Sequence, residues 1–328
     1  YEVNQRTPTV LVLDGGFSTQ LSCHVGTTSD GDPLWSARFL QTHPDDVVDT
    51  HLDFLRAGSD IIITNTYQAS VGGFVKHLGL TPGEGYALIK HAVSLAQRAR
   101  DTYLEECIET GHPARTPPLI AGSIGPYGAH LHDGSEYSGD YADKTAVETI
   151  REWHMPRIRA LVESGVDFLA FETIPCLKEA EVLVKVLKEY PKIKGWLSFS
   201  CKDEQSLAHG EDFRAAVRKC WDLNPNQLIA IGVNCCSPKI VSKLFEGIND
   251  NTTQSPIPLI TYPNSGEKYN PEIGWIDRDK CEALANFVPG WLDSGVRYVG
   301  GCCRTYATDI SLIKNQVHIW LGTHKKSD

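Results

Sequence analysis

Val299-Gly300-Gly301-Cys302-Cys303-Arg304-Thr305 ends the last apolar run of the chain and sets two cysteines side by side. A disulfide between neighbouring residues is strained, because its Cα atoms must lie roughly 4.4–6.8 Å apart with a dihedral angle near 90°. The two preceding glycines free the backbone from the strand's pleat, so both sulfurs can turn toward one point. The stretch therefore favours a soft metal ion over a disulfide.

A second apolar run ends in the same way, at Gly232-Val233-Asn234-Cys235-Cys236. Three cysteine sulfurs with a vacant fourth position are typical of a catalytic zinc, whereas four protein ligands close a structural zinc. The alternative is packing, because free cysteine is among the most buried residue types. We expect Cys236 to face away from Cys235, since successive side chains of a strand alternate. The cysteines without a partner pattern are interpreted as structural: Cys23, Cys107, Cys176, Cys201, Cys220 and Cys281.

Short apolar runs alternate with segments of helical periodicity along the whole chain. Strands are predicted at 10–13, 61–63, 118–122, 166–171, 195–200, 228–233, 258–261 and 296–299. Helices are predicted at 44–57, 84–107, 144–164, 178–190, 212–223, 238–248, 277–292 and 308–320. This alternation over 328 residues predicts a single α/β domain, residues 1–328, folded as a (β/α)8 TIM barrel.

An open, doubly wound sheet is the competing fold. It is disfavoured because the turn after the first strand, Asp14-Gly15-Gly16, lacks the rest of a dinucleotide-binding GxGxxG motif. Polar or thiol residues also follow nearly every predicted strand, where a barrel places its active site. Cys235 and the Cys302/Cys303 pair follow the sixth and eighth strands, so we expect them at the same mouth of the barrel.

Residues 127–141 form a long stretch without periodicity that is rich in glycine, histidine and tyrosine. Loops of this length are usually functional or disordered, and the aromatic content argues against disorder. The motif His130-Leu131-His132-Asp133 resembles a metal-binding HxH, but that motif belongs after the first strand of a barrel. We therefore interpret it as part of a solvated loop.

The charge balance excludes some classes of partner. The chain carries 31 basic and 41 acidic residues, a formal charge of −10, and no long basic cluster. Nucleic acid and anionic membranes are therefore not expected as partners. The polar amino end predicts neither a signal peptide nor a spanning helix, so we expect a cytoplasmic protein with reduced cysteines, as a monomer or small homo-oligomer.

Three thiolates around Zn²⁺ leave a net charge of −1, which makes the ion a weak Lewis acid. Such a site activates water poorly, but it can hold a further thiolate that stays nucleophilic, because coordination removes the thiol proton. The pattern therefore predicts alkyl transfer to the thiol of a substrate.

The motifs at the strand ends resemble, in order from the first strand to the last, those of the zinc-dependent homocysteine S-methyltransferases. They are Asp14-Gly15-Gly16, Phe54-Leu55-Arg56-Ala57-Gly58, Thr66-Tyr67-Gln68-Ala69, Ser123-Ile124-Gly125-Pro126, Phe171-Glu172-Thr173-Ile174-Pro175, Gly232-Val233-Asn234-Cys235, Tyr262-Pro263-Asn264-Ser265-Gly266-Glu267 and Gly300-Gly301-Cys302-Cys303-Arg304-Thr305.

The resemblance implies a barrel whose zinc is bound by Cys235, Cys302 and Cys303. It implies that Asp14 and Glu172 meet the amino group of homocysteine, and it adds Ser123 to the substrate-binding residues. Asn264 matches a residue that in some relatives fills the open position of the zinc before substrate arrives. Asp14 could instead cap a turn, since aspartate before two glycines is common turn chemistry.

The identity of the methyl donor depends on the aromatic residues. Relatives that use betaine surround its quaternary ammonium with aromatic rings. Trp35 matches one ring, although it could also be a packing anchor, whereas Gln68 and Thr173 stand where two tyrosines are expected. A smaller aromatic set favours a sulfonium donor that carries an amino acid. S-methylmethionine is the preferred donor, because Glu136-Tyr137-Ser138-Gly139-Asp140-Tyr141 resembles the subgroup that uses it, and S-adenosylmethionine is a second candidate.

Two other functions are left open by the sequence. The first is a betaine-dependent homocysteine methyltransferase. The second is a barrel without turnover that senses zinc or redox state through Cys302 and Cys303. The carboxylates of Asp14 and Glu172 argue against a sensor, which has no use for a substrate-binding pair.

Overall fold

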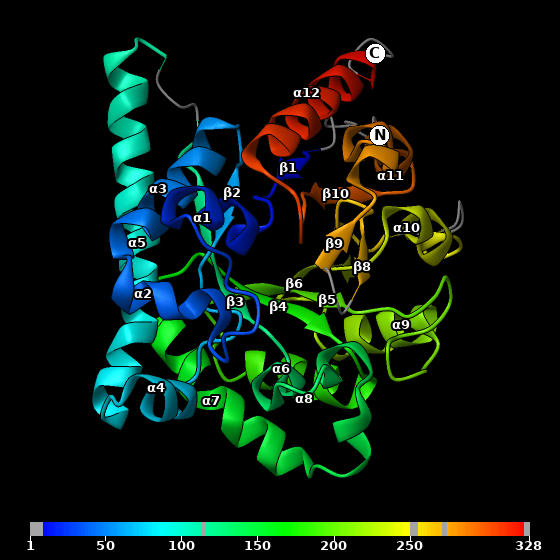
Figure 1. The fold of residues 1–328 in the computed structure, drawn as a ribbon. Helices are drawn as coiled ribbons and strands as arrows, with labels where there is room; N and C mark the ends of the chain where they lie inside the picture. Colours follow the sequence, from blue (N-terminus) through cyan, green and yellow to red (C-terminus); the bar gives the residue numbers. More distant parts are fainter. Residues whose placement is uncertain (1–8, 113–115, 250–254, 271–273, 325–328) are drawn as a thin grey trace.

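Eight parallel strands stand at the centre of the computed structural model, which describes residues 9–112, 116–249, 255–270 and 274–324 (Figure 1). They are β1 (Leu11–Val12), β2 (Ile61–Ile63), β3 (Leu119–Ile124), β4 (Phe168–Ile174), β5 (Lys194–Phe199), β6 (Leu228–Asn234), β7 (Leu259–Tyr262) and β10 (Val296–Val299). Their spatial order is β1-β10-β7-β6-β5-β4-β3-β2, and every neighbouring pair is parallel.

The two ends of this sheet meet at Asp60, the residue before β2. The Asp60 backbone N–H donates to the Val12 carbonyl at 2.7 Å, and the Val12 N–H donates to the Asp60 carboxylate at 2.8 Å. Asp60 is held from the other side by Lys314, whose ammonium lies 2.7 Å from the carboxylate. These contacts join β1 to β2, so the predicted (β/α)8 barrel is confirmed.

Helices surround the strands (Figure 1). They are α1 (Phe17–Val25), α2 (Phe39–Thr42), α3 (Pro44–Arg56), α4 (Val71–Leu78), α5 (Pro82–Glu109), α6 (Tyr127–Leu131), α7 (Val147–Glu163), α8 (Leu177–Leu187), α9 (Phe213–Leu223), α10 (Pro238–Phe245), α11 (Val288–Asp293) and α12 (Ala307–His324). The long helix α5 begins at a capping box, in which Thr81 and Glu84 satisfy each other's backbone N–H groups and Pro82 occupies the first turn.

The core has two layers. Inside the barrel, side chains from alternate strand positions pack together, among them Leu13, Ile61, Trp196, Ile260 and Tyr262. A larger apolar layer lies between the strands and the surrounding helices. Because the strands are covered on both faces, they read in the sequence as continuous apolar runs. Among the described helices, none combines the length and the apolar character that crossing a lipid bilayer requires.

The predicted helix 277–292 is wrong. A 3-10 turn at Arg278–Lys280, another at Leu284–Asn286 and the short helix α11 occupy that region instead. Pro289 contributes to this break, because a proline has no backbone N–H to donate and fits most readily in the first turn of a helix, where α11 places it. A small antiparallel pair, β8 (Lys268–Asn270) and β9 (Gly274–Ile276), precedes this region and was not predicted.

The predicted loop 127–141 is more structured than its sequence indicated. It contains α6 and two 3-10 turns, Ser135–Tyr137 and Asp140–Asp143. Helices α1 and α4, which follow the first and second strands, were also not predicted. Gly72 and Gly73 within α4 weaken its helical pattern, since glycine is a poor helix former.

Candidate active site

A cavity of about 750 Å³ opens at the carboxyl ends of the barrel strands. Its lining includes every residue that the sequence predicted for the site, namely Asp14, Trp35, Gln68, Ser123, Glu172, Cys235, Asn264, Cys302 and Cys303. These residues come from the whole length of the chain, and parallel strands bring them together because their carboxyl ends share one rim.

The sulfurs of Cys235, Cys302 and Cys303 lie within 4.8 Å of one another. The Cys235 and Cys303 sulfurs are 3.8 Å apart. Two thiolates bound to one tetrahedral zinc ion at about 2.3 Å lie about 3.8 Å apart, so this spacing fits. Cys235 and Cys302 are paired as a disulfide, with their Cα atoms 5.6 Å apart. Binding of a metal by all three sulfurs requires this pair to be reduced, since the thiolate is the ligand.

The neighbouring Cys236 packs into the outer apolar core with 5% of its surface exposed, as expected for the opposite face of the strand. Burial raises the pKa of the Cys303 thiol to about 11. An isolated thiol at this position would stay protonated at neutral pH, so a nearby cation is needed to keep it as a thiolate.

The backbone around the cavity is unusually strained. Cys235, Arg304, Thr173 and Trp35 have left-handed φ angles of 50°, 63°, 60° and 45°. They account for four of the six non-glycine residues with positive φ in the described part of the chain. Each such conformation costs on the order of 1–3 kcal/mol, and strain of this kind is concentrated at functional sites. At Cys235 the left-handed turn follows β6 directly, where the chain leaves the strand.

Hydrogen bonds fix the segment that carries Cys302 and Cys303. The Cys302 N–H donates to the Pro263 carbonyl at 2.8 Å, and the Cys303 N–H donates to the Asn264 side-chain oxygen at 3.1 Å. The Arg304 N–H donates to the Thr19 hydroxyl at 3.0 Å. The amide oxygen of Asn264 thus positions the backbone of Cys303.

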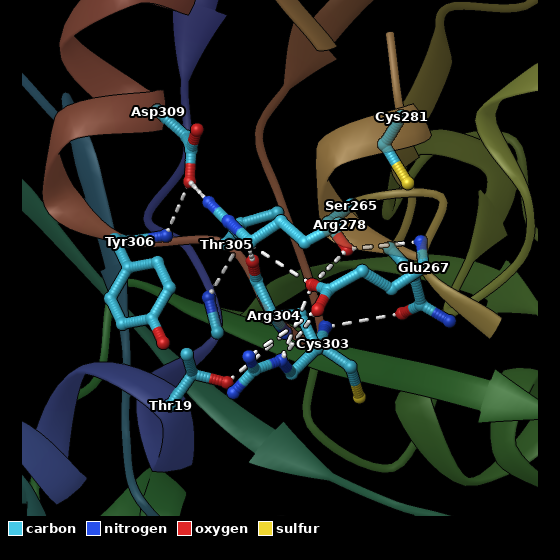
Figure 2. Close-up of polar contacts among 12 residues, drawn as sticks. Thr19, Ser265, Glu267, Arg278, Cys281, Cys303, Arg304, Thr305, Tyr306 and Asp309 are labelled. Atoms are coloured by element: carbon cyan, nitrogen blue, oxygen red, sulfur yellow. Dashed lines mark hydrogen bonds and ion pairs between the residues drawn. The ribbon is translucent and has the colours of Figure 1, made fainter. Parts of the chain in front are cut away.

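A buried carboxylate supports the same segment from behind (Figure 2). Glu267, whose side chain is 1% exposed, pairs with Arg304 at 3.3 Å and with Arg278 at 3.1 Å, and it accepts from the Ser265 hydroxyl at 2.8 Å. Arg278 also donates to the Arg304 carbonyl at 2.7 Å. Figure 2 shows the Cys303 sulfur pointing away from this cluster. The sequence included Glu267 in a motif but gave it no role.

Asp14 and Glu172 are buried in the same cavity, after β1 and near the end of β4. Asp14 accepts from the Ile63 N–H at 2.7 Å, and Glu172 accepts from the Ser123 hydroxyl. Burial raises the pKa of Glu172 to about 6. Burial, together with the charge of Glu172, raises the pKa of Asp14 well above its usual range, against the Ile63 N–H that lowers it. Neither carboxylate forms an ion pair with a described basic residue, so the pair can receive a cationic group.

Gln68 and Trp35 lie on the wall formed by the loops after β1 and β2. The Gln68 amide nitrogen donates to the Ala129 carbonyl at 3.1 Å and contacts the His132 ring at 3.0 Å. The Trp35 ring meets the Tyr67 ring edge-on, with centroids 5.8 Å apart. Gln68 therefore tethers the loop after β3, and Trp35 and Tyr67 form an aromatic wall.

Several residues of the cavity were not predicted as site residues, although Tyr67, Glu136, Tyr137 and Tyr262 stand in motifs quoted above. Phe17, Tyr67, Glu136, Tyr137, Tyr262 and Trp275 all line it. The aromatic lining is therefore larger than the sequence indicated. The tyrosine-rich loop 127–141 carried the signal for Glu136 and Tyr137, but without periodicity the direction of its side chains was not predictable. His130 and His132 line a neighbouring cavity of about 480 Å³ and, among the described residues, do not gather into a three-ligand group.

Comparison with known proteins gives consistent matches over nearly the whole chain. A family model described as homocysteine S-methyltransferase matches residues 11–317. The betaine-homocysteine S-methyltransferase of Drosophila melanogaster is 48% identical over 327 residues, covering 96% of this chain and 98% of the relative. The homocysteine S-methyltransferase of Escherichia coli is 38% identical over 307 residues, covering 93% and 94%.

Solved structures agree with the sequence matches. The metallated form of the homocysteine methyltransferase MmuM from Escherichia coli superposes with a TM-score of 0.79 at 36% identity, covering 96% of this chain and 98% of that one. The oxidized form of the same enzyme gives a TM-score of 0.80, covering 96% and 97%.

Proposed function

This chain belongs to the homocysteine S-methyltransferase family, and on that premise we propose that it methylates homocysteine with a sulfonium compound in a zinc-dependent reaction. S-methylmethionine is the preferred methyl donor, and S-adenosylmethionine is a further candidate. One observation carries the proposal: three cysteine sulfurs within 4.8 Å of one another share a cavity with two buried carboxylates that form no ion pair among the described residues. The product is methionine.

Asp14 and Glu172 bind the ammonium of homocysteine. Their side chains are buried and lack a basic partner among the described residues, so an incoming ammonium replaces the missing counter-charge. A cation beside them favours the charged form of both groups and lowers their pKa values. Ser123 holds the Glu172 carboxylate in place through its hydroxyl.

Cys235, Cys302 and Cys303 are the zinc ligands. When bound, zinc supplies a cation that keeps the sulfur of homocysteine as a thiolate at neutral pH. The chain prepares this site through the left-handed turn at Cys235, the Asn264 contact to Cys303 and the Glu267–Arg304 pair, which fix the three side chains before any substrate arrives.

The methyl transfer balances without a general base. The homocysteine thiolate supplies the electron pair for a new sulfur–carbon bond, and the bond between the methyl carbon and the sulfonium sulfur breaks. Its electron pair stays on the departing sulfur, which becomes a neutral thioether. With S-methylmethionine both products are methionine. The contribution of the protein is orientation, and well-placed reactants reach effective molarities of roughly 10⁵ M or more.

A second candidate methyl donor is betaine. It is favoured by the name of the Drosophila melanogaster relative and by the aromatic lining of Trp35, Tyr67 and Tyr137. Aromatic faces attract a quaternary ammonium and a sulfonium alike. A redox sensor without turnover is the third candidate, since Cys235 and Cys302 pair as a disulfide. A sensor function does not account for the buried carboxylates of Asp14 and Glu172.

A panel of methyl donors tests the proposal. Purified protein, reduced and loaded with zinc, is incubated with homocysteine and S-methylmethionine, S-adenosylmethionine or betaine, and methionine is quantified. We expect the highest kcat/KM with S-methylmethionine. Turnover with betaine alone overturns the choice of methyl donor, and the absence of methionine with every compound overturns the enzyme function itself.

A further inference from the structure

Glu136 lies in the wall of the active-site cavity, and one of its carboxylate oxygens is buried. Its Oε2 atom is shielded from solvent and has no hydrogen-bond partner among the residues that the structure describes. The residue belongs to the 3-10 turn Ser135–Tyr137, in the loop after β3, and lines the same cavity as the three sulfurs. A buried acceptor without a partner costs roughly 1–3 kcal/mol, and more when it is charged. An unpaired carboxylate in a cavity wall therefore indicates a ligand group that completes it.

The surroundings of Glu136 do not supply a cation. Arg304 is the one basic residue among the described residues that line the cavity, and it is paired with Glu267. Asp14 and Glu172 also face this space without ion pairs among the described residues, so the cavity carries excess negative charge. Burial raises the pKa of Glu136, which marks a carboxylate poorly compensated by the protein itself.

The neighbouring groups are suited to a different part of a ligand. Tyr67 lines the same cavity, and its ring stands edge-on against Trp35. Aromatic faces attract a sulfonium, which has no N–H or O–H to donate. A carboxylate oxygen, in contrast, is satisfied by an N–H donor, and a primary ammonium carries three of them. The aromatic rings therefore suit the sulfonium of an amino-acid sulfonium compound, and the Glu136 carboxylate suits its primary ammonium.

We propose that Glu136 binds the primary ammonium of the methyl donor and so selects an amino-acid sulfonium over betaine. This inference rests on the proposed function. The quaternary ammonium of betaine has no N–H group and leaves the Glu136 oxygen without a partner. S-methylmethionine satisfies that oxygen, and its net charge of +1 offsets the excess negative charge of the cavity, whereas betaine is neutral overall.

The test compares two sulfonium compounds that differ in the ammonium. S-methylmethionine carries it and dimethylsulfoniopropionate does not. The variant Glu136→Gln keeps the size of the side chain and removes its charge. Its kcat/KM for S-methylmethionine is expected to fall roughly tenfold or more, mainly through KM, while the value for dimethylsulfoniopropionate changes by less than about twofold. If the wild-type protein does not turn over the second compound, its inhibition constant against S-methylmethionine replaces kcat/KM.

Asp140→Asn is the matched control. Asp140 lies in the same loop, is exposed and does not line the cavity, so its loss changes the net charge equally. The control should leave both compounds unaffected. Equal losses with both compounds in Glu136→Gln would indicate a structural role and overturn the inference, as would an unchanged KM for S-methylmethionine. Failure of the proposed function shows separately, because the wild-type protein would then make no methionine from S-methylmethionine.

Discussion

At the scale of single residues, Glu267 explains why the two adjacent cysteines hold one conformation. Its carboxylate is buried between two guanidinium groups, Arg304 and Arg278. Arg304 is the residue directly after Cys303 and has a left-handed φ of 63°. The ion pair therefore stabilises a strained turn next to a proposed zinc ligand. Groups that orient metal ligands typically affect metal affinity about 10–100-fold when they are changed.

Glu267→Gln is expected to weaken zinc binding by about 10–100-fold. The amide keeps the shape but loses the charge that holds Arg304 and Arg278. Zinc affinity is measured by competition with a chromophoric chelator. The control is Glu181→Gln, because Glu181 also contacts two basic side chains, Lys185 and Lys219, on the outside of the barrel. Equal zinc affinity in wild-type and Glu267→Gln protein would contradict a supporting role.

His51 provides a test of pH dependence. Its two ring nitrogens are buried and have no hydrogen-bond partner in the described part of the chain, and the ring packs against Phe17 at 4.7 Å between centroids. Burial lowers the pKa of His51 from 6.5 to about 3. Between these pH values the His51 ring is protonated in the unfolded chain but neutral in the folded protein. The free energy of unfolding therefore falls as the pH falls below 6.5.

The variant His51→Leu should remove this dependence. Between pH 6 and 4, His51 is expected to lower the free energy of unfolding of the wild type by up to about 1.4 kcal/mol per pH unit. The variant lacks this contribution, so its free energy of unfolding should depend less steeply on pH. Urea unfolding at several pH values measures both slopes. Parallel pH profiles for the two proteins would show that His51 does not titrate in this window.

At the scale of elements, helix α7 ties together the loops that form one wall of the cavity. Arg157 donates to the Tyr67 carbonyl at 2.8 Å, after β2, and to the Gly125 carbonyl at 2.6 Å, after β3. Its neighbour His154 contacts Glu179 of α8 at 2.6 Å. All of these polar side chains are buried, so the backbone of Tyr67 is fixed by a network that lies outside the cavity.

Arg157→Met should lower the free energy of unfolding by about 3 kcal/mol or more, because the carbonyls of Tyr67 and Gly125 lose a charged donor and Glu179 loses a nearby buried cation. Arg151→Met in the same helix is the control. Arg151 pairs with Glu189 at 2.9 Å but is exposed, and such pairs contribute at most about 1 kcal/mol. Urea unfolding measures both variants. Similar losses in the two variants would mean that the buried network does not stabilise the fold as described.

The sequence was informative where the local pattern and the fold agree. Strands such as Leu228–Asn234 are continuous apolar runs because both faces are covered, and their ends marked the cavity correctly. The prediction of secondary structure failed at 277–292, where helical spacing of the apolar residues did not produce a continuous helix. Leu284 and Val288 have helical spacing, but Pro289 divides the segment. The role of Glu267 depends on contacts with Arg278 and Arg304, and that proposed for Glu136 depends on where its loop lies in the cavity wall. Neither is visible in the periodicity of the sequence.

At the scale of the whole molecule, the barrel converts distant sequence positions into one site. Cys235 follows β6 and Cys302 follows β10, with only β7 between them in the sheet. The β6–β7 and β7–β10 registers align these strand ends, since Asn234 lies opposite Tyr262 and Thr261 lies opposite Val299. The carboxylates of Asp14 and Glu172 face the same space from other strands. The proposed function therefore requires the three sulfurs to act together on one ion.

Zinc content and methionine formation, measured on the same samples, test this claim most directly. The samples are reduced wild-type protein, Cys235→Ala, and Cys236→Ala as a control for a neighbouring cysteine outside the cavity. We predict that the wild type and the Cys236→Ala control each bind about one zinc ion per chain and form methionine. Cys235→Ala should lose both the zinc and the methionine formation. Full methionine formation by zinc-free Cys235→Ala protein would contradict the account.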